Sequence, residues 1–494
     1  MGPFDFPTAI VDKAARARAV AQAKANGVRL PTFAEIAEPW TAPKSATAGL
    51  ASVDPDAADA RNLYRVNWYN DLSRKGRVPV PVHIELPSAF TGVSARIVVV
   101  LGALFPMIRA HKVLAAYSCL APRLVSGHFD PVKQRAVWPS TGNYCRGGVA
   151  ISRILGCRGV AVLPAGMSQE RFDMIEEYGA QVIKTPGCES NVKEIYDKTH
   201  ELMAADPDVR NMNQFEVMGN YRFHYYVTGN TIIDLARELA EQGIGAGKAS
   251  AYVSAMGSAG TIAAGDRLKQ EWHDHKIVGL EPIQCPTLAL NGYGGHDIQG
   301  IGDKHVTWIH NVLNMDAIML IDDVESKLGL QLFADEGGRK ALVKKIGMDA
   351  GLVEYLSTRV GISSICNILG AIKTAKYYKM GKDDLVVTVA TDGLDRYGSV
   401  MDDMRRDYGV VDEIETVARV RSLFHARTTD YIWEGNADNR ARWHNLKYYT
   451  WVEQQGKTVQ ELDAQRDPAW WEAEQARVKE IDAKLLEYRR TGRI

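Results

Sequence analysis

The chain has 494 residues, of which 46% are hydrophobic and 24% charged, and its formal net charge is −1. This balance excludes recruitment to nucleic acid or to an anionic membrane by bulk charge, and no stretch reaches the roughly 20 uninterrupted apolar residues that span a bilayer. The six cysteines form no Cys-x-x-Cys pair, which favours reduced thiols in a cytoplasm over disulfides or a metal site. Because the length exceeds what one hydrophobic core usually serves, we expect more than one lobe. The cysteine pattern adds the expectation of a cytoplasmic protein without a bound metal.

The first 77 residues are predicted to form an arm that precedes the main fold. They begin with an Ala-rich helical stretch and continue as loop-like sequence containing prolines. Residues 78–86 (VPVPVHIEL) are predicted to be extended. Pro79 and Pro81 lack the N–H group that pairs a strand with its neighbour, so we expect the first half of this segment to lie at a sheet edge. Residues 95–101 (ARIVVVL) are β-branched and apolar, which predicts a strand.

The central part of the chain alternates strands with helices. Apolar runs predict strands at 159–163, 181–185, 251–254, 277–280 and 385–389, and helices are expected at 169–178, 230–242 and 261–272. Ser168 is placed to cap the first of these helices, because a serine oxygen accepts from the amides at a helix start. The residue three positions on is Arg171, which does not complete a capping box. The alternation predicts a parallel sheet in an α/β fold.

The last part of the chain, after about residue 400, is charged and helix-prone. Five of the ten tryptophans fall in it, at positions 433, 443, 451, 470 and 471. A purely solvated tail would not carry so many large apolar side chains, so we expect this tail to dock on the core or on another subunit.

A candidate anion-binding loop follows the predicted strand 251–254. Residues 256–261 (MGSAGT) are small and open a helix, so backbone amides and the hydroxyls of Ser258 and Thr261 can approach a phosphate. A tight strand-to-helix turn without ligand is the alternative. A nicotinamide dinucleotide site using Gly257–Gly260, with Glu281 about twenty residues on, also remains open, although the loop lacks G-x-G-x-x-G spacing.

Two further motifs carry functional groups. Ser140-Thr141-Gly142-Asn143 follows a predicted strand and offers hydroxyls, a carboxamide and backbone amides to an anion, although a capped helix start gives the same pattern. Lys112 lies among apolar residues, where desolvation favours the neutral amine that a Schiff base requires. Most lysines are solvated, so its local context alone does not identify it.

Taken together, these motifs resemble the cysteine synthase and cystathionine β-synthase family of fold-type II pyridoxal phosphate (PLP) enzymes. The resemblance runs in order from about residue 78 to 400, and Lys112 precedes Asn143 by 31 residues, close to the family's spacing. Further matching segments are 84–101, 167–187, Asn213-Gln214-Phe215 with His224 and Thr228-Gly229, 279–282, 296–302, 361–364 and Asp395-Arg396-Tyr397.

The resemblance implies a role for each matching residue. Lys112 would hold the cofactor as a Schiff base and then move the α-proton of the substrate. The cofactor would be bound by Asn143, Gly257, Ser258, Ala259, Gly260 and Thr261, with Thr391 or Asp392 at the pyridine nitrogen. The substrate would be bound by Ser140, Thr141, Gly142, Tyr144, Gln214 and Gly300.

Some positions depart from the family pattern. The residues around Lys112 read Ala110-His111-Lys112-Val113-Leu114 rather than Ser-x-Lys-Asp-Arg, and Tyr144 stands where the family usually has a small residue. Tyr144 is therefore predicted to reshape the pocket. Four other polar residues are interpreted as ordinary core or surface residues rather than catalytic groups: His111, His128, Asp130 and Cys145.

The implied fold is a two-lobed α/β architecture like that of the tryptophan synthase β-subunit, with parallel-rich sheets. The boundaries expected are an arm over 1–77, a large cofactor domain over 78–112 and 236–400, a small mobile substrate domain over 113–235, and a helical extension over 401–494. The enzyme would be a cytoplasmic homodimer or higher homo-oligomer without nucleic-acid or membrane partners.

The implied activity is β-elimination or β-replacement on a serine-like, cysteine-like or other β-substituted amino acid, through an aminoacrylate intermediate. A NAD-dependent dehydrogenase and a catalytically silent scaffold of the same fold are the alternatives.

Overall fold

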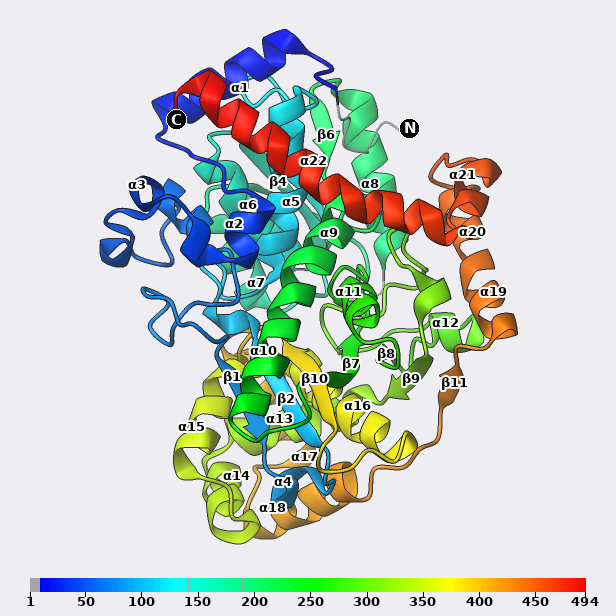
Figure 1. Cartoon of the computed structure of the whole chain (residues 1–494). Helices are drawn as coiled ribbons and strands as arrows, with labels where there is room; N and C mark the ends of the chain where they lie inside the picture. Colours follow the sequence, from blue (N-terminus) through cyan, green and yellow to red (C-terminus); the bar gives the residue numbers. More distant parts are fainter. Residues whose placement is uncertain (1–8, 141, 189–190) are drawn as a thin grey trace.

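A computed structural model describes residues 9–140, 142–188 and 191–494. In this part of the chain the strands form two sheets (Figure 1). One sheet has seven strands in the order β1-β2-β10-β7-β8-β9-β11, and the other has four in the order β5-β4-β3-β6. Across the same residues, none of the helices combines the length and the apolar character that crossing a membrane requires.

The seven-stranded sheet is parallel through its centre and antiparallel at both edges. Its strands are β1 (His83–Leu86), β2 (Arg96–Leu101), β10 (Leu385–Ala390), β7 (Ala249–Ala255), β8 (Lys276–Pro282), β9 (Ala317–Ile321) and β11 (Ile432–Glu434). β1 pairs antiparallel with β2, and β11 with β9. Alternate residues of β2 enter different cores: Val98 and Val100 join one cluster, while Ile97 and Val99 join another. Both faces are therefore buried, which explains the continuous apolar runs in the sequence.

The four-stranded sheet is parallel throughout. It consists of β3 (Arg135–Pro139), β4 (Arg158–Pro164), β5 (Gln181–Thr185) and β6 (Val209–Asn211). The helices α6 (Asn143–Ile154) and α8 (Val192–Ala205) pack on this sheet, and α5 (Lys112–Ser126) packs on α6. The strands predicted over 159–163 and 181–185 are confirmed as β4 and β5. α7 (Gln169–Glu176) follows Ser168, but the predicted side-chain cap is wrong, because the Ser168 hydroxyl instead donates to the Arg396 carbonyl at 3.3 Å.

The remaining helices cover the larger sheet or belong to the two ends of the chain. α16 (Ile362–Tyr377) packs against β7 and β10, and α10 (Gly229–Glu241) packs against α11 (Ala264–Glu271). The others are α3 (Lys44–Thr47), α4 (Ser88–Thr91), α9 (Met218–Phe223), α12 (Thr287–Leu290), α13 (Asp323–Ala334), α14 (Glu336–Ala341), α15 (Ala350–Arg359), α17 (Gly398–Tyr408), α18 (Glu413–Arg419), α19 (Ala437–Asn445), α20 (Lys447–Trp451) and α21 (Val459–Ala464).

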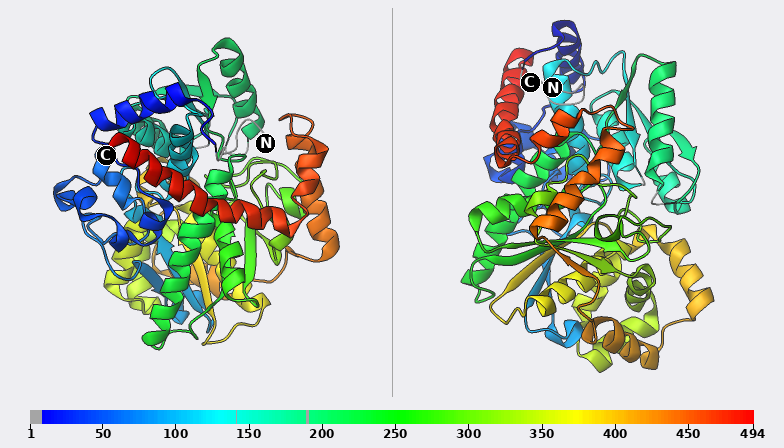
Figure 2. Two further views of the ribbon diagram at one scale, coloured as in Figure 1. Left: turned by 45° about the horizontal axis from the view of Figure 1, so that its top comes forward. Right: turned by 90° about the vertical axis from the view of Figure 1, so that its right-hand side faces the viewer.

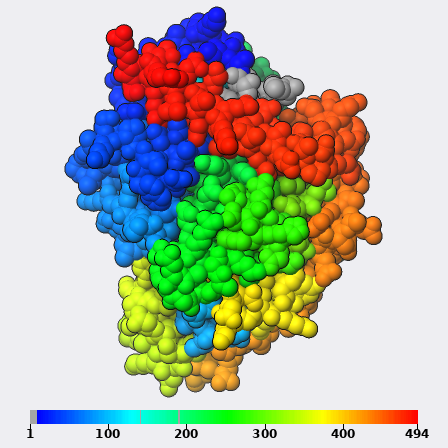
Figure 3. All heavy atoms as spheres, viewed as in Figure 1, coloured from blue at the N-terminus to red at the C-terminus, as the bar shows by residue number. Residues whose placement is uncertain are grey.

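The two ends of the chain pack on each other and on the core. α1 (Lys13–Ala25) and the long α22 (Pro468–Gly492) both contact α5, and they lie together in both views of Figure 2. The tail residues meet the arm on the surface in Figure 3. At α2 (Phe33–Ala37), the amides of Phe33 and Ala34 donate to Asp482 of α22, which ties arm and tail together.

The tail docks on the core of its own chain, as one of the two expected arrangements requires. Trp443, Trp451 and Trp471 are buried, with exposed fractions of 0%, 0% and 4%. The tail was expected to be helical, but it also contributes β11, which completes an edge of the large sheet. Sequence periodicity did not indicate a strand of three residues.

Candidate active site

A hollow opens where the carboxyl ends of β3, β7 and β10 converge, which is the usual position of a ligand site in parallel sheets. Its empty volume is about 640 Å³, counting the opening to solvent. It is lined by His111, Lys112, Ser140, Asn143, Tyr144, Gln214, Ser254, Ala255, Gly257, Ser258, Ala259, Thr261, Gln299, Gly300, Ile301, Asp303, Ser363, Asn367 and Thr391.

Lys112 stands at the first turn of α5 and reaches into this hollow. Its Nζ donates to Gln214 Oε1 at 3.0 Å and to Ser258 Oγ at 3.1 Å. These two partners come from separate segments, the predicted substrate residue and the predicted phosphate loop. Lys112, Gln214 and Ser258 come from motifs that are far apart in the sequence, and the fold brings the last two within hydrogen-bond distance of the Lys112 amine.

The loop after β7 is shaped by close packing against two other segments. A Cβ added at Gly257 would lie 2.4 Å from the Gly300 carbonyl oxygen, and one added at Gly260 would lie 2.2 Å from Asn220 Oδ1. Ala259 has a φ of +60°. Gly260 is not among the residues that line the hollow, so its small size serves packing against Asn220 rather than ligand contact.

The loop after β3 carries the second predicted motif. Gly142, with a φ of +152°, precedes the first residue of α6, and its amide donates to Ser140 Oγ at 3.2 Å. A Cβ at Gly142 would lie 1.9 Å from Arg171 Nη1, so this glycine also allows close packing. Ser140, Asn143 and Tyr144 line the hollow and Gly142 does not, whereas Thr141 lies outside the described residues.

Tyr144 is anchored rather than free in the hollow. Its hydroxyl donates to the Met212 carbonyl at 2.6 Å, and its ring packs edge-on against Trp138 at 5.4 Å. Burial raises the pKa of this hydroxyl well above its ordinary value, so it remains a donor. Met212 lies two residues before Gln214, and the side chain of Tyr144 therefore supports the segment that carries Gln214.

Asn143 is held from behind by a buried polar network. Its Nδ2 donates to Asp392 Oδ2 at 2.6 Å, and its Oδ1 accepts from Arg396 Nε at 3.2 Å. Asp392 is 1% exposed and also accepts from the Tyr397 hydroxyl at 3.1 Å. Asp392 does not line the hollow, whereas its neighbour Thr391 does.

His111 lines the hollow, although the sequence alone did not distinguish it from an ordinary core residue. Its Nε2 lies 3.0 Å from Thr261 Oγ1, and Trp68 of the arm stacks on its ring at 5.6 Å. Burial lowers the pKa of His111 well below its ordinary value, with His224 and Lys112 adding to the shift. Burial also lowers the pKa of His224, to about 3, so both rings are neutral around neutral pH.

Several lining residues were missed by sequence reasoning. Asn367 of α16 accepts from the Ala255 amide at 2.7 Å through its Oδ1, and Ser363 lies one turn earlier. Ser363 lies within the matching segment 361–364, although the match gave it no role, whereas no local pattern marks Asn367 inside its buried helix. Gln299 directly precedes the predicted Gly300 within the matching segment 296–302, and Asp303 lies three residues after Gly300, so their proximity to this segment was the available signal.

Two of the residues interpreted as ordinary remain so in the structure. Cys145 is buried, and burial raises the pKa of its thiol to about 12, which leaves it un-ionised. Asp130 pairs with Arg18 of the arm at 2.7 Å, outside the hollow.

Glu281, the acidic residue that a dinucleotide site would use to bind a ribose, is hydrogen-bonded to the protein itself. It is 4% exposed, and its carboxylate accepts from the amides of Leu288 at 2.9 Å and Ala289 at 3.1 Å. A ribose would have to displace both of these backbone donors. The geometry therefore speaks against the dehydrogenase interpretation.

Comparison with known proteins identifies the class. The family described as pyridoxal-phosphate dependent enzyme matches residues 75–392, and the chain belongs to this family. It is therefore an enzyme that uses PLP, and its α/β architecture is the fold-type II arrangement. The predicted fold class, enzyme class and cofactor are confirmed.

Within this family the chain is similar to cysteine synthases. Cysteine synthase B of Campylobacter jejuni is 30% identical over 254 residues, which are 51% of this chain and 74% of that protein. The structure of O-acetylserine sulfhydrylase isoform 3 from Entamoeba histolytica aligns with a TM-score of 0.55 at 25% identity, covering 70% of this chain and 94% of that one. A mutant of a hydrogen sulfide-producing enzyme from Fusobacterium nucleatum aligns with a TM-score of 0.54 at 25% identity, covering 69% and 89%.

The residues of the hollow fit this cofactor. A primary amine, an amide-rich glycine loop with two hydroxyls, and a carboxamide all face one space. Gln299 Oε1 is buried without a hydrogen-bond partner among the described atoms, so one further donor can be accommodated there.

Proposed function

We propose that this enzyme catalyses β-elimination or β-replacement on a serine-like, cysteine-like or other β-substituted amino acid, with Lys112 as the cofactor-binding lysine. The observation that carries the proposal is the convergence of Lys112 Nζ on Gln214 and Ser258 within one hollow. The likeness to cysteine synthase, to O-acetylserine sulfhydrylase and to a hydrogen sulfide-producing enzyme supports this reaction class.

The phosphate of the cofactor would be bound by the loop Gly257–Thr261. The loop leads into a short 3-10 turn and then α11, so its amides and the hydroxyls of Ser258 and Thr261 face an anion at a helix start. Ser258 lies 3.1 Å from Lys112 Nζ, which places phosphate loop and lysine on the same side of the hollow.

The ring of the cofactor would be held by Asn143 and Thr391. A carboxamide carries two N–H groups; Asn143 gives one to Asp392, and the second would bind the ring hydroxyl. The Thr391 hydroxyl would face the pyridine nitrogen, because Thr391 lines the hollow while Asp392 is occupied by Asn143 and Tyr397.

The substrate carboxylate would lie at the start of α6. Ser140, the backbone amides of Asn143 and Tyr144 at the first turn of α6, and the carboxamide of Gln214 are donors in that region. When bound, the cofactor withdraws electrons and acidifies the α-carbon of the substrate. Lys112 would then take the α-proton, the β-substituent would leave with its electron pair, and water or a nucleophile would complete elimination or replacement.

Three finer features belong to the same proposal. The segment 113–235 would form a small mobile domain, and all four strands of the smaller sheet fall within it. The large cofactor domain would comprise 78–112 and 236–400. The resemblance to cysteine synthases also supports a homodimer that acts in the cytoplasm.

The test starts from the purified enzyme with its cofactor. Lys112→Ala should abolish the visible absorption band, while the exposed Lys133→Ala should retain it. Serine, O-acetylserine, cysteine and threonine are then screened, with and without sulfide, for ammonia, keto acid, sulfide or new amino acid. A full visible band in Lys112→Ala would refute the lysine assignment, and turnover of none of these β-substituted amino acids would refute the reaction class.

A further inference from the structure

The segment 105–111, which leads directly into Lys112, has a backbone that needs external support. Met107 has a φ of +64° and Arg109 a φ of +49°, in the left-handed region that non-glycine residues rarely adopt. Such a conformation is energetically unfavourable for a residue with a side chain, and it persists only where surrounding contacts impose it. Those contacts therefore decide where α5, and Lys112 at its first position, begins.

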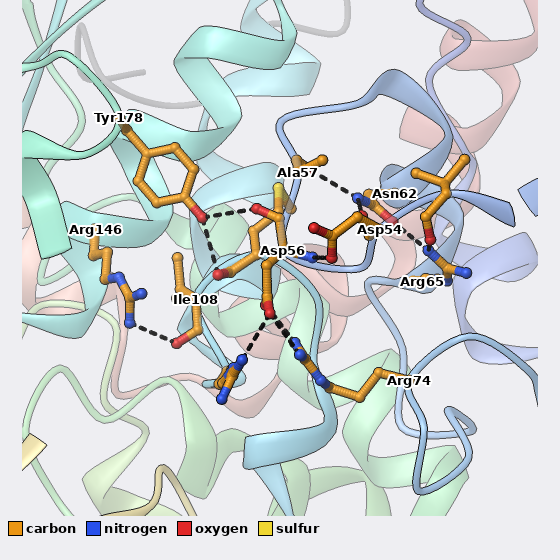
Figure 4. A network of polar contacts seen from close by, with 12 residues as sticks. Asp54, Asp56, Ala57, Asn62, Arg65, Arg74, Ile108, Arg146 and Tyr178 are labelled. Atoms are coloured by element: carbon orange, nitrogen blue, oxygen red, sulfur yellow. Dashed lines mark hydrogen bonds and ion pairs between the residues drawn. The ribbon is translucent and has the colours of Figure 1, made fainter. Parts of the chain in front are cut away.

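Carbonyl groups of this segment are bound by side chains from the body of the enzyme. The Tyr178 hydroxyl donates to the Met107 carbonyl at 2.9 Å, and Arg146 Nη1 donates to the Ile108 carbonyl at 3.0 Å (Figure 4). Arg396 Nη2 also donates to the Ile108 carbonyl and reaches the carbonyl of the following residue at 3.2 Å. Three successive carbonyls thus have donors from distant segments.

The remaining support comes from the N-terminal arm. The Pro55 carbonyl accepts from the amide of Met107, one of the two left-handed residues, at 2.7 Å. The Asp56 carboxylate accepts from Arg109 Nη2 at 2.8 Å and from Arg74 Nη2 at 2.7 Å. Figure 4 shows this carboxylate between two guanidinium groups. The arm therefore contacts both residues that carry the positive φ.

The charge of Asp56 persists at working pH. Burial by itself would raise the pKa of this carboxyl, but hydrogen bonds from Arg74 and Arg109 outweigh burial and hold its pKa at about 2. The group is thus an anion at neutral pH, and its hydrogen bonds are of the stronger, charge-assisted kind. Neither Asp56 nor Pro55 lines the hollow, so any effect they have on the chemistry must pass through the segment 105–111.

We propose that Pro55 and Asp56 of the N-terminal arm are positioning residues, which impose the left-handed conformation at Met107 and Arg109 and thereby place Lys112 in the hollow. The arm up to residue 74 precedes the part of the chain that matches the PLP family, which begins at residue 75. The arm is accordingly a component of the active site rather than an appendage. The inference rests on the assignment of Lys112 as the cofactor-binding lysine.

The test compares Asp56→Asn with Asp59→Asn in the full chain. Asp59 is a matched control, because it also binds an arginine bidentately within the arm, through Arg61, but does not contact the segment 105–111. Asparagine also keeps its role as a helix cap. Two quantities are measured: PLP affinity, from the visible band in a titration of the cofactor-free protein, and hydrogen exchange of the amides in 105–111.

We expect Asp56→Asn to weaken PLP binding about tenfold, the effect of one lost charge-assisted hydrogen bond, and to accelerate exchange in 105–111. Asp59→Asn should change neither, and Asp56→Glu should restore part of the affinity. Unchanged affinity and exchange in Asp56→Asn would overturn the positioning role. Equal losses in Asp56→Asn and Asp59→Asn would overturn it as well, because they would indicate general destabilisation of the arm.

If Asp56→Asn does not fold, Tyr178→Phe decides, since it removes only one hydroxyl, which donates to the Met107 carbonyl at 2.9 Å and to the Asp56 carbonyl of the arm at 3.4 Å. We expect about threefold weaker PLP binding with faster exchange in 105–111, and wild-type values of both would overturn the proposal. Failure of the underlying assignment is recognised separately, because Lys112→Ala would then keep the visible band whatever the arm variants do.

Discussion

Replacing Glu281 by Gln should remove a pH-dependent loss of stability from this enzyme. Burial raises the pKa of Glu281 to about 7, and the backbone hydrogen bonds from Leu288 and Ala289 only partly oppose that shift. Between its unfolded pKa, near 4.5, and about 7, the folded protein holds a proton that the unfolded chain has released. The free energy of unfolding therefore falls as pH rises through this window.

The size of the effect follows from the two pKa values. Linkage predicts that this one group lowers the free energy of unfolding by about 2–3 kcal/mol between about pH 5 and about pH 8. In Glu281→Gln one of the two amides loses its acceptor, which costs about 1–3 kcal/mol. That cost is independent of pH, so it cancels when the variant is compared with the wild type at two pH values.

Urea unfolding of both proteins at about pH 5 and about pH 8 measures the difference. We expect the stability of Glu281→Gln relative to the wild type to rise by about 2–3 kcal/mol between the lower and the higher pH. A difference that is independent of pH would refute the buried, proton-holding carboxyl. Specific NAD binding by the wild type that is lost in the variant would instead revive the dinucleotide interpretation.

Two further predictions concern Gly260 behind the hollow and the buried ion pair of Lys457 with Glu216. Gly260→Ala should weaken PLP binding at least about tenfold, because its Cβ would lie 2.2 Å from Asn220 Oδ1; Gly381→Ala, with no atom within 4 Å, is the control in the same titration. Lys457→Met should destabilise the enzyme by about 3–5 kcal/mol in urea unfolding, because it leaves the buried carboxylate of Glu216, now 2.8 Å from the ammonium, without its charge partner. Adding Glu216→Gln should recover most of that loss, and two additive losses would contradict the pairing.

Much of the fold could be predicted from the sequence, because buried parallel strands require continuous apolar runs. The segments 251–254, 277–280 and 385–389 lie within strands of the large sheet, and 95–101 matches β2 except for Ala95, which precedes it. The order and spacing of the motifs also indicated the PLP family, which the match over residues 75–392 confirms. These features depend on local composition and on linear order, and a sequence carries both directly.

Other features depended on the tertiary structure, because they arise between segments far apart in the chain. Asn367 reaches the hollow from within a buried helix, and Asp56 reaches the segment before Lys112 from the arm. No periodicity marks either residue, since each acts through a partner more than fifty positions away. The same holds for Ser168, whose hydroxyl donates to the Arg396 carbonyl instead of accepting from the amides at the start of α7.

Apolar runs and ordered motifs were enough to predict a PLP enzyme with an α/β fold, and the family match confirms it. Which motif residues face the hollow and which support them became apparent only from the packing of the folded chain. Gly260 and Asp392 belong to the motifs but do not line the hollow. Gly260 packs closely against Asn220, and Asp392 accepts a hydrogen bond from Asn143. A motif fixes the order of residues along the chain, whereas packing fixes the direction in which each side chain points.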